Sequence, residues 1–173
     1  SMVARLRIGE PTHTYALPGA PAEPCDARET ELGGKIRIES GGGKTRIRLP
    51  LYQGEAVWGF GQRLDGFNLR GHAFEVWAED SWNRYDTSYF AVPWFISSRG
   101  YSLFINSSGR IKVDLGHSDP GLIQLELPGE GAEVWTFQGT PSAMVSAYSE
   151  LVGRPQPVPD WIFQPWLSRN SYL

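Results

Sequence analysis

The chain has 173 residues, of which 40% are hydrophobic and 13% aromatic, and its formal net charge is -3. This length suits one ordinary domain with a sizeable core, and the slightly acidic balance argues against a nucleic acid or an anionic membrane as a partner. The 20 glycines and 13 prolines indicate many turns, which favours an all-β class over a helical bundle.

Alternating apolar and polar residues predict about ten short strands in the first four-fifths of the chain. A glycine turn at 41–43 joins two of them into a hairpin, and Arg99-Gly100 marks another turn. This spacing is typical of an antiparallel sandwich or barrel. The expected strands cover residues 3–8, 35–39, 45–49, 56–60, 73–77, 91–97, 101–106, 110–115, 122–127 and 133–137.

The period then changes from two to that of a helix. Thr140 is a candidate N-cap with Pro141 at the first helical position, and Gly153 stands where a helix ends. Alternating prolines make 154–159 a stiff extended connector. The apolar segment that begins at Trp161 is expected to be a strand, which either folds back on the sandwich or starts a second domain.

Metal and cofactor motifs are missing from the sequence. The three histidines are scattered without metal-ligand spacing, no glycine-rich phosphate loop precedes a helix, and no serine sits in a nucleophile elbow. We therefore expect neither a metal nor a cofactor. The single cysteine, Cys25, cannot form an internal disulfide, no signal peptide is visible and no apolar run is long enough to span a membrane. These features favour a cytoplasmic location.

The stretch from 77 to 89 is the candidate binding site. It places the carboxylates Asp80 and Asp86 among aromatic side chains, including Trp77 and Trp82, without a regular period. Aromatic rings cover the C–H face of a sugar, and carboxylates accept hydrogen bonds from its hydroxyls. The alternative is a solvated loop anchored by aromatic core residues. A complete catalytic pair is not expected here, because adjacent acids such as Glu79 and Asp80 point to opposite sides of a strand end.

Five motifs in order resemble the N-terminal part of glycoside hydrolase family 31, the α-glucosidase and α-xylosidase family. They lie at 59–62 (Gly-Phe-Gly-Gln), 77–80 (Trp-Ala-Glu-Asp), 89–106, 148–159 and 166–172. The last two are the most specific. The resemblance runs from about Trp58 to the last residue, whereas residues 1–55 carry no matching motif.

The resemblance implies a galactose-mutarotase-like β-sandwich at 1–139, a helix and proline-rich linker at 140–159, and the first strand of a (β/α)8 barrel at 160–173. The family's nucleophile and general acid/base are aspartates on later barrel strands, so no catalytic residue is expected in this chain. A sandwich loop of the family contacts the sugar, typically through an aspartate. The implied substrate-binding aspartate is Asp80, with Asp86 as the second choice, and the aromatic pattern of the loop adds Trp82 as a substrate-binding residue.

The expected function is therefore the N-terminal portion of a retaining α-glycosidase that hydrolyses terminal α-linked glucose or xylose. Its partners would be the glycoside substrate and the remainder of the barrel. One alternative is a free-standing carbohydrate-binding module with Trp77, Trp82 and Tyr85 as a stacking platform. Another is a structural domain whose tail at 161–173 docks on a partner or on another copy of the chain, giving a homo-oligomer.

Overall fold

The computed structural model describes residues 2–21, 29–31, 35–79, 88 and 90–166. Within them the backbone forms strands and two helices. The strands are β1 (Met2–Gly9), β2 (Glu29–Glu31), β3 (Lys35–Gly41), β4 (Lys44–Pro50), β5 (Val57–Gln62), β6 (Ala73–Val76), β7 (Phe90–Ser97), β8 (Tyr101–Ile105), β9 (Ile111–Leu115), β10 (Leu122–Pro128) and β11 (Gly131–Gln138). The helices are α1 (Pro141–Val152) and a 3₁₀ helix at Asp160–Phe163.

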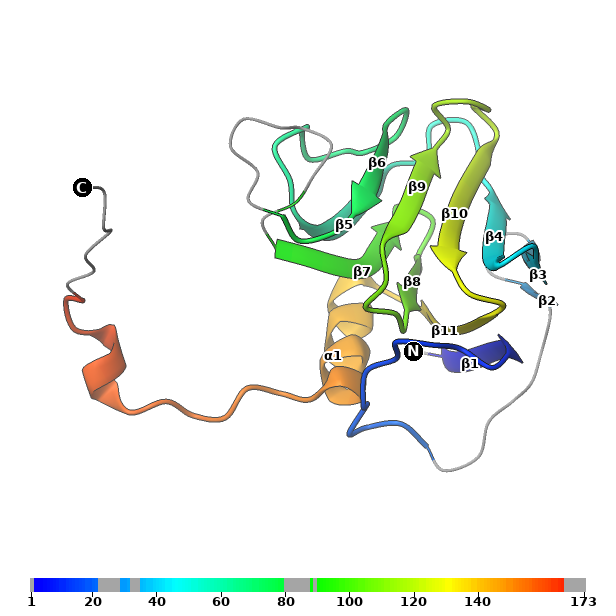
Figure 1. Ribbon diagram of the computed structural model, residues 1–173. Helices are drawn as coiled ribbons and strands as arrows, with labels where there is room; N and C mark the ends of the chain where they lie inside the picture. The colour runs from blue at the N-terminus through cyan, green and yellow to red at the C-terminus, as the bar shows by residue number, and fades with distance from the viewer. Residues whose placement is uncertain (1, 22–28, 32–34, 80–87, 89, 167–173) are drawn as a thin grey trace, which may run out of the picture.

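The strands build two antiparallel sheets that pack face to face (Figure 1). One has five strands in the order β1-β11-β8-β7-β5, and the other has six in the order β2-β3-β4-β10-β9-β6. A single cluster of buried apolar side chains fills the space between them and includes Leu6 and Phe95 from one sheet and Ile47 and Val113 from the other. The expected all-β sandwich is confirmed.

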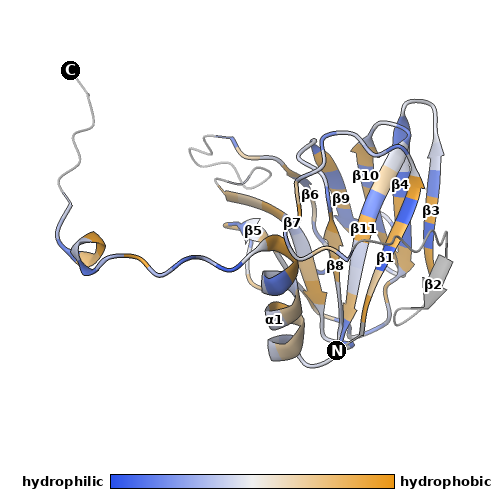
Figure 2. Cartoon of the chain, turned by 90° about the horizontal axis from the view of Figure 1, so that it is seen from below, coloured by the Kyte–Doolittle hydropathy of each residue, from blue (hydrophilic) through white to orange (hydrophobic). Residues whose placement is uncertain are grey.

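The period-two pattern explains how the core forms. On β4 the side chains of Ile47 and Leu49 are buried while Arg46 and Arg48 reach solvent, and Ile47 pairs with the equally buried Leu125 of β10. Alternation of this kind gives the six-stranded sheet one dry and one wet face, which Figure 2 shows as bands of opposite hydropathy along its strands. The basic residues of the hairpin therefore lie on its wet face.

Helix α1 forms a third layer over the outer face of the five-stranded sheet. Thr140 is its N-cap, and its hydroxyl oxygen accepts a hydrogen bond from the Ala143 backbone N–H at 3.3 Å. Met144 packs into a second apolar cluster with aromatic side chains of β8 and β11. The ring of Tyr148 stacks on Trp94 with 4.2 Å between centroids. The helix starts and ends where the sequence predicted.

A buried carboxylate ties the loop after β4 to the β7–β8 hairpin. Glu55 is 2% exposed and accepts hydrogen bonds from the Ser97 hydroxyl at 2.5 Å, the Tyr101 phenol at 2.8 Å and the Tyr52 backbone N–H at 2.9 Å. Burial, together with the Glu55 charge, raises the pKa of Tyr101. Both oxygens of Glu55 are engaged by the fold itself, so this carboxylate holds structure together.

The segment after α1 departs from the expectation. Residues 160–163 form a 3₁₀ helix where a strand was predicted, and 167–173 of that predicted strand lie outside the described residues. A strand needs a neighbour for its backbone groups. Here the bonds are local instead, from Ile162 N–H to the Pro159 carbonyl at 3.0 Å and from Gln164 N–H to the Trp161 carbonyl at 3.2 Å. Figure 1 shows this segment running away from the sandwich.

Two smaller findings complete the fold. Strand β2 was not predicted, because three residues are too few to show a period. Among the described residues, no helix combines the length and the apolar character needed to cross a bilayer.

Candidate functional site

The candidate site is the end of the sandwich where β5, β6 and β7 approach the loop at 77–89. The three residues expected to bind sugar, Asp80, Trp82 and Asp86, lie outside the described residues. The structure does describe the two ends of this loop, at 77–79 and at 88, and the strands on either side of it. These parts show how the loop is attached.

Ser88 fastens the loop at its base. Its side chain is buried, and its hydroxyl lies 2.7 Å from the Gln62 carbonyl oxygen and 2.8 Å from that of Phe90. Its backbone completes a parallel bridge to the outgoing side of the loop: Glu79 N–H donates to the Ser88 carbonyl at 3.1 Å, and Ser88 N–H donates to the Trp77 carbonyl at 3.4 Å. The two ends of the loop are therefore joined to each other and to the end of β5.

A bulge in β5 sits beside this anchor. The β5–β7 register shifts between Gly59 and Gly61, and Phe60 between them has a φ of 62°, which is rare for a residue with a side chain. The Phe60 ring is fully buried and packs 5.3 Å from Phe74 and 5.2 Å from Phe95. A side chain at Gly61 would overlap the Phe90 carbonyl, so the close approach of β5 to β7 requires glycine.

A buried ion pair follows the bulge. The Arg63 guanidinium donates to both oxygens of Asp65, with Nε–Oδ1 and Nη2–Oδ2 distances of 3.0 Å, and the two side chains are 2% and 11% exposed. The same guanidinium lies 3.5 Å from the centre of the Phe74 ring on β6. A bidentate pair of this kind fixes geometry, so it ties the chain after β5 to β6. This pair was not predicted from the sequence, because neither residue stands at a recognisable spacing.

Exposed apolar side chains occur at the start of β7 and in the chain after β5. Phe67 is 82% exposed, Phe90 66% and Leu64 61%, and Phe67 lies 5.9 Å from the Trp58 ring between centroids. Large exposed apolar side chains that gather in one region commonly mark a surface that meets another molecule or domain.

Trp77 is the one member of the expected stacking platform that the structure describes. Its ring is 37% exposed, and the Arg110 guanidinium lies 5.0 Å from the ring centre while also pairing with Glu75 at 2.8 Å. One face of this indole therefore already has a cation against it. Trp82 and Tyr85 lie outside the described residues, so the platform as a whole stays a prediction.

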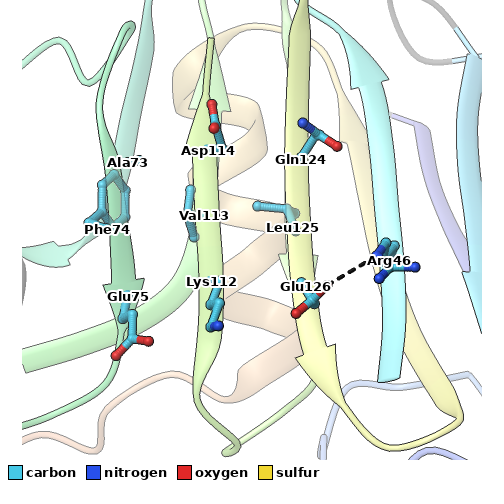
Figure 3. Close-up of a pocket in the computed structure, with 10 residues that line it drawn as sticks. All are labelled: Arg46, Ala73, Phe74, Glu75, Lys112, Val113, Asp114, Gln124, Leu125 and Glu126. Atoms are coloured by element: carbon cyan, nitrogen blue, oxygen red, sulfur yellow. Dashed lines mark hydrogen bonds and ion pairs between the residues drawn. The ribbon is translucent and has the colours of Figure 1, made fainter. Parts of the chain in front are cut away.

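A depression of about 400 Å³ crosses β6, β9, β10 and β4 (Figure 3). Burial by itself disfavours the charged form of Asp114, but hydrogen bonds from Ser118 and the His117 backbone N–H outweigh it and lower its pKa. The Lys44 ammonium, with the Arg46 guanidinium, lowers the pKa of Glu126. A glycosidase acid needs a raised pKa, so these two carboxylates are unsuited to that role. The described residues contain no group of His, Cys, Asp or Glu that could hold a metal ion.

Comparison with known proteins identifies the family to which the chain belongs. A family model described as the glycosyl hydrolase 31 N-terminal galactose mutarotase-like domain matches residues 10–114. The chain belongs to this family. The matched region contains the β5 bulge, the buried ion pair, the loop at 77–89 and β7, so the candidate site lies within the part of the chain that matches the family model.

The relatives are much longer proteins. An alpha-xylosidase of Emericella nidulans is 30% identical over 129 residues, which are 74% of this chain and 16% of that enzyme. An alpha-glucosidase of Saccharolobus solfataricus is 26% identical over 179 residues, covering 98% of this chain and 25% of the enzyme. The chain thus spans about a sixth to a quarter of the length of these relatives.

Solved structures share the fold. The Flavobacterium johnsoniae GH31 dextranase complexed with glucose matches with a TM-score of 0.65 and 23% identity, over 72% of this chain and 16% of that one. The cycloalternan-degrading enzyme from Trueperella pyogenes, in complex with cycloalternan, matches with a TM-score of 0.61 and 22% identity, over 76% of this chain and 19% of that one. These structures confirm the expected β-sandwich, and the family model over residues 10–114 confirms the expected family.

Proposed function

We propose that this chain is the N-terminal sandwich of a retaining α-glycosidase of family 31 that hydrolyses terminal α-linked glucose or xylose. The printed activities of its relatives, alpha-xylosidase and alpha-glucosidase, support the substrate class. Both are four or more times as long as the matched region, which supports placing the nucleophile and the acid/base elsewhere in the complete protein. The lowered pKa values of Asp114 and Glu126 argue against either of them as the general acid.

Within that enzyme the loop at 77–89 supplies substrate contacts. Asp80 accepts hydrogen bonds from sugar hydroxyls, Trp82 covers a C–H face and Asp86 is a second acceptor. The observation that carries this proposal is the loop base: a buried serine and a backbone bridge join its ends to β5 and β7. Binding groups contribute most when a rigid scaffold holds their loop, because little freedom is then lost on binding.

The catalytic barrel is the proposed partner of this sandwich, with 160–173 as the start of the barrel after the helix and proline-rich linker at 140–159. The described part of that segment exposes three large aromatic side chains, at 55% for Trp161, 78% for Phe163 and 65% for Trp166. Apolar area of this size is stabilised by burial against another layer, which a barrel would supply.

Substitution in the complete enzyme tests the loop. Asp80→Ala should lower kcat/KM on α-glucosides and α-xylosides about 10- to 100-fold, because a hydrogen bond to a charged group is lost. Glu10→Ala is the matched control: it removes an exposed carboxylate that pairs with Arg7, at the end of β1, and should leave the kinetics unchanged. Unchanged kinetics for Asp80→Ala would show that Asp80 does not bind the substrate.

Calorimetry separates this function from that of a carbohydrate-binding module. The isolated chain titrated with isomaltose, maltose and xylo-oligosaccharides should give no binding heat, since a loop alone covers only one side of a sugar. Binding at millimolar or lower concentration would favour the module instead. The arginine stacked on Trp77 argues against a free aromatic platform there.

A further inference from the structure

A nearly buried arginine on β1 has a donor without an acceptor among the described residues. The Arg5 side chain is only 13% exposed, and its Nε–H has no acceptor among the described residues. Its guanidinium lies 5.3 Å from the centre of the Trp135 ring, and Nη1 lies 4.0 Å from a carboxylate oxygen of Glu133. At this distance the two charges attract each other, but the Nη1–oxygen separation is too long for a hydrogen bond. Buried donors without acceptors are rare in folded proteins because they cost free energy.

The neighbouring carboxylate is held away by other bonds. Glu133 Oε1 accepts hydrogen bonds from Asn106 Nδ2 at 2.8 Å and from Trp135 Nε1 at 2.9 Å. Asn106 in turn pairs with both backbone groups of Tyr15, at 2.8 Å and 3.1 Å. Because these contacts fix Glu133, it does not close on the guanidinium, and the buried Arg5 Nε–H stays without an acceptor among the described residues.

A pocket of about 400 Å³ lies beside this arginine. Its walls come from β1, from β11, from the segment at 19–21 and from α1. Gly19 N–H donates to the Leu151 carbonyl at 3.1 Å, and a side chain at Gly19 would overlap the backbone of Glu150. Only glycine lets this segment approach the helix so closely, so the pocket has a fixed wall.

We propose that this pocket binds a small carboxylate through Arg5. The planar guanidinium presents paired N–H donors whose spacing matches the two oxygens of a carboxylate. Glu150 also lines the pocket, and although its carboxylate pairs with Arg154 at 2.9 Å, its charge disfavours a doubly charged anion such as phosphate. Its oxygens are acceptors for hydroxyl groups, so a hydroxylated acid such as a sugar acid fits the pocket better than a plain one.

The site is separate from the proposed substrate loop. β1 and β5 are the two opposite edges of the five-stranded sheet, with Arg5 on one and the base of the loop at the other. The carboxylate site therefore does not depend on the glycosidase assignment.

Titration of the 173-residue chain tests the proposal. The probes are sodium glucuronate and sodium acetate, with sodium chloride at equal ionic strength and glucose as a neutral control. We expect one arginine Nε–H resonance to move saturably with glucuronate, and with acetate at higher concentration. Arg5→Lys keeps the charge but removes the planar fork and should weaken binding at least about tenfold. Arg7→Lys, two residues away on the same strand and paired with Glu10, is the matched control and should bind as the wild type does.

Three results would overturn the proposal: no saturable shift with either acid, equal binding by Arg5→Lys, or glucose causing the same shift as glucuronate. If Arg5→Lys fails to fold, a second signal from the wild-type chain tests where the acid binds. The Trp135 indole N–H must then follow the same saturation curve as the arginine signal, because the guanidinium lies against that ring. An indole signal that stays in place would place the acid elsewhere and contradict the site.

Discussion

The sandwich and the segment after α1 contain the same kinds of side chain in opposite environments. Phe95 lies between the two sheets and Trp135 lies between the five-stranded sheet and α1, and both are at most 1% exposed. Trp161 and Phe163 are more than half exposed. The backbone of the sandwich is paired strand to strand, while that of the segment is bonded to itself. Sequence pattern alone does not separate the two, because an apolar run predicts burial without saying what covers it.

Core and tail phenylalanines provide the sharpest contrast. Phe95 lies between Phe60 and Tyr101 with no exposed surface, so Phe95→Ala should lower the free energy of unfolding by about 3–5 kcal/mol. Phe163→Ala removes the same atoms from an exposed position and should change it by less than about 0.5 kcal/mol. Urea unfolding followed by tryptophan fluorescence measures both. Equal effects would mean that the tail belongs to the core.

Two ion pairs extend the contrast from apolar to charged groups. Asp65→Asn removes the charge of a buried carboxylate that pairs with the Arg63 guanidinium and should destabilise the sandwich by about 3 kcal/mol. Glu10→Gln breaks the exposed pair with Arg7 and should have an effect of at most about 0.5 kcal/mol. Chemical unfolding at matched ionic strength compares them. A small effect at Asp65 would contradict the role given to this pair beside the loop.

Two glycines test the close approach of β5 and β7. Both Gly61 and Gly66 have positive φ, at 87° and 106°, but only Gly61 faces a backbone atom that a side chain would overlap. We expect Gly66→Ala to cost about 1 kcal/mol and Gly61→Ala at least about 2 kcal/mol, with the excess coming from overlap with Phe90. Thermal unfolding of the two variants gives the difference. Equal shifts would show that β5 moves freely at the bulge.

Much of the sandwich could be predicted because its strands alternate. Residues 35–39 and 45–49 gave a hairpin in the correct place, and Thr140-Pro141 marked the start of α1. The β5 bulge, the Arg63–Asp65 pair and the Ser88 anchor were not predicted, because each depends on contacts between distant parts of the chain. The tail was predicted as a strand from its apolar residues, but strand structure requires a neighbour that the described residues do not provide.

The smallest expected effect concerns acid stability. The pKa of Glu126 is lowered in the fold by Lys44 and Arg46, from an ordinary value of 4.5. Its contribution is therefore present above that value and is lost as the pH falls through the lower, folded value. Between pH 5 and about pH 3 the wild type should lose a few tenths of a kcal/mol more than Glu126→Gln, as expected for a partly exposed pair. Urea midpoints across this range check the sign, and a steeper loss in the variant would contradict it.

Turnover of a glycoside tests the central claim most directly: this sandwich serves a family 31 α-glycosidase without carrying its reactive groups. The measurement compares release of p-nitrophenol from p-nitrophenyl α-xyloside and α-glucoside by the 173-residue chain and by the complete gene product. We predict hydrolysis by the complete product and none by the chain. Turnover by the purified chain, or an inactive complete product on every α-glycoside tried, would contradict the account.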